Sequence, residues 1–123
     1  QDYRDFYPNE LSGGLKQRVS IARAFIYPSD LILMDEPFRS LDFKLKINII
    51  KDLLNLEKES KKTIFLVTHD TKVAYLLADK AIVLSEKPAE ILSEITFLSP
   101  KEERQLYSDD FHRFEDKVFE ELL

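Results

Sequence analysis

The chain contains no cysteine, only two glycines, and no apolar run long enough to cross a bilayer. Without cysteine, disulfide bonds and thiolate metal sites are excluded, which suits a protein from a reducing compartment. Without a long apolar run, any association with a membrane has to be peripheral. Basic residues are scattered and the formal net charge is -5, so we expect no nucleic-acid partner.

What is present favours a folded domain. The chain has 123 residues, of which 44% are hydrophobic, enough for a modest core. No internal repeat or low-complexity tract interrupts it. The chain opens with Gln1 rather than Met, in the middle of a pattern, and we therefore expect that further residues precede it.

Helical and β-rich segments alternate along most of the chain. The predicted helices cover residues 15–26, residues 43–58 and a short segment that ends near Ala78. The predicted strands cover residues 31–34, 63–67 and 81–84. This alternation predicts an α/β fold in which parallel strands are flanked by helices. Ligands of such sheets bind at the carboxyl ends of the strands.

The C-terminal part has a different pattern. Residues 89–97 are predicted to form a strand or hairpin arm, and Ser99 followed by Pro100 resembles the capped start of a helix. An apolar stripe at helical spacing continues to the end of the chain through Phe111, Phe114, Val118 and Leu122. No flexible linker separates this tail from the rest. We expect a main domain over residues 1–98 and a helical appendage over residues 99–123.

Both glycines lie at the start of the first predicted helix, within the stretch Leu-Ser-Gly-Gly-Leu-Lys-Gln-Arg. Gly13 and Gly14 allow the backbone to approach a ligand closely, and a helix N-terminus favours an anion such as phosphate. The hydroxyl of Ser12 could donate a further hydrogen bond. By itself this octapeptide is equally compatible with an ordinary capped helix that begins at a glycine turn.

Acidic and imidazole side chains follow two of the predicted strands. Asp35 is placed to hold Mg2+ and Glu36 to face a nucleophilic water, although acids also commonly follow strands without any function. His69 can donate a hydrogen bond to a terminal phosphate. His112 lies in the acidic C-terminal segment without a partner pattern, and there a solvated surface role is favoured.

In their order and spacing, these motifs resemble those of the ATP-binding-cassette (ABC) family of transporter ATPases. Residues 11–18 look like its signature motif, residues 31–36 like its Walker B motif, residues 40–42 like its D-loop, and His69 like its switch histidine. The similarity extends from Tyr7 to about residue 91. It implies that the chain is the C-terminal part of a P-loop NTPase domain of the ABC type.

The resemblance implies ATP and Mg2+ as ligands and assigns roles within the ATPase cycle. Asp35 would organise Mg2+, Glu36 would act as the general base and His69 would contact the γ-phosphate of ATP. The signature residues implied to reach ATP bound by a second subunit are Ser12, Gly13, Gly14 and Gln17. Asp42, grouped with them as ATP-binding, would lie across the dimer seam and couple the two sites. Hydrolysis in this family requires two such domains to close head to tail.

Two departures from the family pattern are visible. The fifth signature position, often glutamine in the family, is Leu15, and we expect activity to survive this change. The phosphate-binding loop G-x-x-x-x-G-K-[ST] is absent. We therefore expect that the 123-residue chain alone neither binds ATP tightly nor hydrolyses it. Because the strand of that loop normally pairs beside residues 63–67, we also expect an unpaired strand edge there.

Residues 36–42, 67–70 and 84–88 are similar to those of importers for nitrate, sulfonates and taurine. This similarity implies a homodimer with a second nucleotide-binding subunit, permease subunits, indirect dependence on a solute-binding protein, and a peripheral place at the cytoplasmic face of the membrane. One alternative is a DNA-repair or chromosome-maintenance ATPase, which would need coiled coils or basic surfaces elsewhere. Another is a non-enzymatic interaction remnant, since the phosphate loop is missing.

Overall fold

The computed structural model describes residues 13–123, and the chain divides into two compact units. The first unit ends at His69 and the second runs from Asp70 to Leu123. Ser12 and the rest of the signature stretch before Gly13 lie outside the described residues. The predicted boundary between residues 98 and 99 stays a prediction.

The first unit contains two helices and two strands in alternation. In chain order these are α1 (Gly13–Ile26), β1 (Leu31–Asp35), α2 (Phe43–Glu59) and β2 (Thr63–Val67). The sequence prediction is confirmed for each element, with shifts of one or two residues at three ends. Helix α1 begins earlier than predicted because both glycines adopt helical backbone conformations rather than preceding the helix.

Strands β1 and β2 pair in parallel, from Leu31 opposite Thr63 to Asp35 opposite Val67. The carboxyl ends of the two strands therefore meet at the same edge of the sheet, as predicted. Among the described strands, β2 pairs only with β1, so its other edge has no partner strand. The expectation of an unpaired edge is confirmed.

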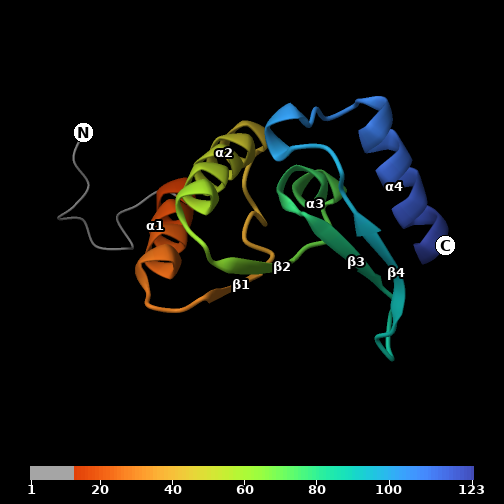
Figure 1. The fold of residues 1–123 in the computed structure, drawn as a ribbon, viewed down its shortest axis with the longest axis horizontal. Coiled ribbons are helices and arrows are strands. Elements are labelled where there is room, and N and C mark those ends of the chain that lie inside the picture. The colour runs from red at the N-terminus through yellow and green to blue at the C-terminus, as the bar shows by residue number, and fades with distance from the viewer. Residues whose placement is uncertain (1–12) are drawn as a thin grey trace. The chain divides into compact units, whose positions relative to one another are not determined.

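The two faces of this strand pair are covered unequally. Ile32 and Met34 are buried, and Figure 1 shows both helices of the first unit on one side of the strands. The alternate residues on the other face are exposed. They are Leu31, Leu33, Phe65 and Val67. Since parallel sheets are usually covered on both faces, the apolar character of this second face fits the α/β class.

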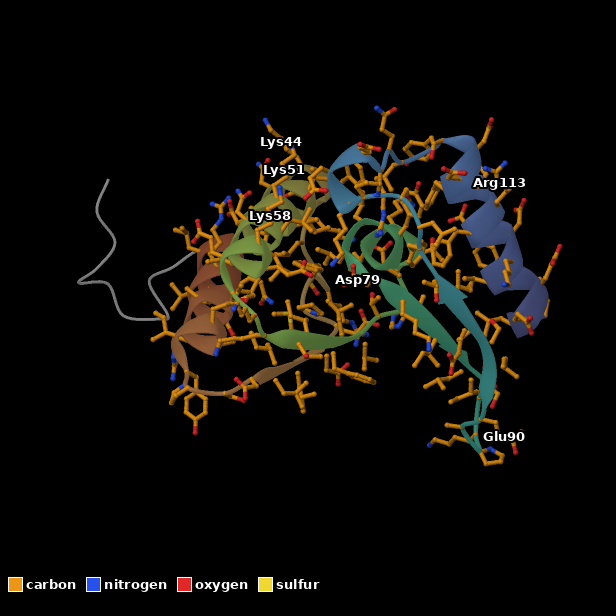
Figure 2. The ribbon with its side chains drawn as sticks, in the orientation of Figure 1. Lys44, Lys51, Lys58, Asp79, Glu90 and Arg113 are labelled. Atoms are coloured by element: carbon orange, nitrogen blue, oxygen red, sulfur yellow. The ribbon has the colours of Figure 1, made fainter. Side chains whose placement is uncertain are left out.

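Helices α1 and α2 pack against each other, with Gly14 close to the side chain of Leu45. The Nε of Arg18 lies 2.9 Å from Oδ2 of Asp52 and links the two helices at their exposed side. The solvent side of α2 carries lysines at seven-residue spacing, which Figure 2 shows pointing outward. They are Lys44, Lys51 and Lys58. This periodicity is that of a helix with one buried and one solvated face.

The second unit is built from a helix, a hairpin and a C-terminal tail. Its elements are α3 (Thr71–Leu77), β3 (Lys80–Leu84), β4 (Ile91–Thr96), the short 3-10 helix η2 (Lys101–Glu103) and α4 (Asp109–Leu122). Strand β3 pairs antiparallel with β4 and forms a sheet separate from that of β1 and β2. The prediction of a parallel sheet therefore holds for the first two strands and not for the third.

The helix predicted to start at Ser99 and Pro100 does not form as expected, and that prediction was wrong. Pro100 adopts an extended backbone (φ -58°, ψ 141°), no side chain caps the segment, and only the single turn η2 follows. Ser108 caps the helix instead, since its Oγ accepts a hydrogen bond from the amide of Phe111 at 3.2 Å. Residues 99–102 have the residue types of a helix start, but the packing of the segment after them outweighs this local preference.

The tail packs on α3 and the hairpin through aromatic side chains. Tyr75, Phe111 and Phe114 form a buried cluster, and Phe97 from the end of β4 contacts Phe114 at 4.9 Å between ring centroids. Edge-to-face and stacked ring pairs of this kind add stability beyond their buried area. Within residues 13–123, no helix combines the length and apolar character that a membrane-spanning segment requires.

Candidate active site

Glu36 follows β1 directly and has an unusual backbone conformation. Its φ of 46° lies in the left-handed region, which costs a non-glycine residue about 1–2 kcal/mol. The amide of Glu36 nevertheless extends the parallel ladder, because it donates a hydrogen bond of 2.8 Å to the carbonyl of Val67. The chain thus turns sharply at the strand end while its backbone stays tied to β2. Strained backbone of this kind is frequent at functional sites.

The loop after β2 receives the carboxylate of Glu36. The backbone N–H of His69 donates to Oε1 at 2.9 Å, and the imidazole Nδ1 of His69 contacts the same oxygen. The hydroxyl of Thr68 donates to Oε2 at 3.3 Å. The structure therefore brings together Glu36 and His69, two residues singled out from sequence, and adds Thr68, which sequence reasoning missed.

The two partners differ in exposure. The side chain of Glu36 retains 18% of its accessible surface, whereas that of His69 retains 82%. The carboxylate is thus held in a largely desolvated position, where hydrogen bonds are stronger than in water. The imidazole stands at the surface, where it can meet a ligand from solvent. This asymmetry suits a fixed acid–base group beside a group that contacts an incoming anion.

Asp35 is the last residue of β1 and is exposed. Among the described residues, no group of three or more His, Asp or Glu side chains is placed to hold a metal ion. A metal ion held by Asp35 would therefore have fewer than three such ligands from the described residues. This is compatible with Mg2+, which commonly takes one or two carboxylates and completes its shell with water and phosphate oxygens.

The two glycines at the start of α1 have different surroundings. A Cβ added at Gly14 would lie 2.6 Å from a side-chain carbon of Leu45, so close packing of α2 on α1 favours glycine there. A Cβ added at Gly13 would meet no atom within 4 Å. Packing within the described residues therefore accounts for Gly14 and leaves Gly13 unexplained. An open position at a helix N-terminus fits the predicted contact with an anion.

The remaining predicted site residues lie on the two helices of the first unit. Gln17 is half-buried on α1, one turn after Gly13. Asp42 is the N-cap of α2, where its Oδ1 accepts a hydrogen bond of 3.0 Å from the amide of Leu45. The contacts of Glu36 and His69 do not include any of these residues. Asp42 thus has a structural role in this chain in addition to the predicted contact across a dimer.

His112 is exposed on α4, beside the rings of Tyr107 and Phe111. No acidic or second imidazole side chain accompanies it in a metal site among residues 13–123. The expected solvated role therefore agrees with its surroundings.

Comparisons with known proteins identify the family. The family model described as ABC transporter matches residues 1–39. An uncharacterised ABC transporter ATP-binding protein of Methanocaldococcus jannaschii is 36% identical over 118 residues, covering 96% of this chain and 44% of that protein. The chain therefore spans less than half the length of this relative.

Two further relatives have named transport roles. A nitrate import ATP-binding protein of Synechococcus elongatus is 38% identical over 105 residues, which cover 83% of this chain and 38% of that protein. An aliphatic sulfonates import ATP-binding protein of Bacillus cereus is 36% identical over 116 residues, which cover 94% of this chain and 46% of that protein. Together with the parallel strand ends that hold Glu36 and His69, these similarities show that the chain belongs to the ABC transporter family and carries part of its P-loop NTPase domain.

Proposed function

We propose that this chain is part of the ATP-hydrolysing subunit of an importer for a small solute such as nitrate, a sulfonate or taurine. The observation that carries the proposal is the pairing of Glu36 with His69 at the carboxyl ends of two parallel strands. The similarity to nitrate and sulfonate import proteins supports the solute class. The importer setting implies permease subunits and a peripheral place at the cytoplasmic face of the membrane.

In the proposed reaction Glu36 accepts a proton from the water that attacks the γ-phosphate of ATP. Its fixed, largely desolvated carboxylate is suited to this role, because general bases act from a defined position. The exposed imidazole of His69 donates a hydrogen bond to the same phosphate group. Asp35 would hold Mg2+, which would neutralise charge on the phosphate oxygens when bound.

Residues of α1 and its preceding stretch serve a second copy of the domain. Gly13 leaves open space at the start of α1, and a helix N-terminus attracts phosphate oxygens through its unpaired amides. The proposed contacts to ATP held by the partner subunit come from Ser12, Gly13, Gly14 and Gln17. Asp42, the N-cap of α2, would lie across the dimer seam and couple the two sites. Hydrolysis therefore requires a closed dimer, and the 123-residue chain without a phosphate-binding loop turns over no ATP.

The test compares Glu36→Gln with the unchanged complete protein in which the chain occurs. We expect Glu36→Gln to lower ATP turnover about 100-fold or more while ATP-driven dimerisation persists, since the base is lost and the binding groups remain. Glu90→Gln is the matched control, because Glu90 lies exposed at the tip of the β3–β4 hairpin (Figure 2). Turnover by Glu36→Gln at the unchanged rate would remove Glu36 from this role.

A further inference from the structure

The hydroxyl of Thr68 contacts the carboxylate that the proposed reaction uses. We propose that Thr68 is a positioning residue, which orients the carboxylate of Glu36 toward the attacking water. The inference rests on the proposed function of Glu36 as a base. It goes beyond that function because it gives a second residue, Thr68, the role of orienting the carboxylate of the base.

Three consecutive residues of the β2 end hold Glu36. The carbonyl of Val67 accepts from the Glu36 amide at 2.8 Å, the amide of His69 donates to Oε1 at 2.9 Å, and the hydroxyl of Thr68 donates to Oε2 at 3.3 Å. The backbone and both carboxylate oxygens are therefore each attached to the same short segment. The imidazole of His69 also contacts Oε1, so the hydroxyl of Thr68 is the side-chain contact to the other oxygen, Oε2, and it can be changed without altering the backbone ladder.

The physical need for this contact follows from the freedom of a glutamate side chain. The last torsion of glutamate has a broad, roughly two-fold preference, so a carboxylate held at one oxygen can rotate about that attachment. A second donor at the other oxygen restricts the plane of the group. Because a general base acts only from within hydrogen-bond reach of its proton, loss of this restriction lowers the fraction of productive geometries.

Threonine is suited to this position for two reasons. Its β-branched side chain has few χ1 alternatives, so the hydroxyl direction is well defined. Thr68 is half-buried, which limits competition from water for Oε2 of Glu36. Valine has nearly the same shape without the hydroxyl, and serine keeps the hydroxyl without the methyl group. These two substitutions therefore separate hydrogen bonding from packing.

The experiment measures steady-state ATP turnover of the complete protein with Thr68→Val, Thr68→Ser and Thr63→Val. We expect Thr68→Val to lower kcat about tenfold with KM little changed, since orientation and not ATP binding is affected. Thr68→Ser should recover most of the loss. Thr63→Val is the same change at the exposed start of β2. It should leave kcat and KM unchanged, and it controls for a general effect of threonine-to-valine substitution near this strand.

A second measurement does not depend on turnover. In the chain labelled with 13C, the carboxyl resonance of Glu36 should move in Thr68→Val and return toward its original position in Thr68→Ser. If the unchanged complete protein hydrolyses ATP and Thr68→Val retains its kcat, the inference is overturned while the proposed function stands. If the complete protein is inactive, the proposed function fails, and an unmoved Glu36 resonance would overturn the contact with Thr68 as well.

Discussion

The buried side chains of the first unit are mostly aliphatic, whereas those of the tail-bearing second unit include a cluster of aromatic rings. Ile32, Ile49 and Leu53 are nearly inaccessible in the first unit. Tyr75 and Phe111 have the same status in the second. Aliphatic side chains fill the layer between helices and strands, while a few large rings can close a small unit that has little regular sheet.

The two units also use charged groups differently. In the first, Glu36 is oriented by hydrogen bonds from neighbouring strand ends, at the place where chemistry is proposed. In the second, Arg104 is buried, at 8% exposure, and its guanidinium donates to the carbonyls of Ser99, Tyr75 and Ala78. A cation at the end of α3 also complements the helix dipole. In the first unit a charged group is held in place by its neighbours, and in the second a charged group fastens the tail.

The difference in core composition is tested by Phe111→Ala and Leu53→Ala, each of which removes a side chain at 1% exposure. We expect Phe111→Ala to lower the free energy of unfolding by about 3–5 kcal/mol and Leu53→Ala by about 2–5 kcal/mol. Amide hydrogen exchange should show that each change reduces protection most within its own unit. Equal loss of protection in both units would contradict their description as separate compact parts.

The role of Arg104 is tested by Arg104→Ala and Arg104→Lys. Arg104→Ala should lower the free energy of unfolding by about 3 kcal/mol, because three carbonyls lose charge-assisted donors and the ring of Phe97, 4.8 Å from the guanidinium carbon, loses its cation. Arg104→Lys should cost less, since the charge stays and the planar fork is lost. Chemical denaturation of the chain measures both. An unchanged free energy of unfolding in Arg104→Ala would contradict the proposed role of Arg104 in fastening the tail.

The smallest expected effect concerns the two glycines of α1. Gly14→Ala should lower the free energy of unfolding by about 1 kcal/mol, because overpacking against Leu45 exceeds the gain in helix propensity. Gly13→Ala should change the free energy of unfolding by less than about 0.5 kcal/mol, since an added Cβ would meet no atom of the described residues within 4 Å. Thermal unfolding of the two variants checks this order. A larger loss for Gly13→Ala would assign that glycine to folding rather than to ligand contact.

The fold of the first unit was largely predictable because its signals are local and agree with one another. The apolar spacing of α2 and the β-branched run of β2 gave bounds that differ from the structure by at most one residue. The second unit was less predictable. Ser99 and Pro100 have the residue types of a helix start, but only a single 3-10 turn follows them. Arg104, directly after that turn, is buried, and Ser108 is the residue that caps the C-terminal helix.

The candidate site shows the same division. The residue types and positions of Asp35, Glu36 and His69 were visible in the sequence, because acids and an imidazole after buried strands meet at one edge of a parallel sheet. Thr68 was not singled out, although a hydroxyl next to His69 at a strand end could have signalled it. Which oxygen of Glu36 meets which donor depends on a left-handed backbone turn, for which a glutamate gives no sequence signal.

The sequence by itself determined the order of elements in the first unit, its apolar strand pair and the identity of the polar groups at the strand ends, since these depend on residue type and short-range periodicity. Only the tertiary structure decided that packing against Leu45 favours glycine at position 14 while no described residue crowds Gly13, and that β3 pairs with β4 and not with the parallel strands. It also decided that Thr68 shares the carboxylate of Glu36 with His69. These features arise from contacts between residues distant in the chain, whose distances no local pattern encodes.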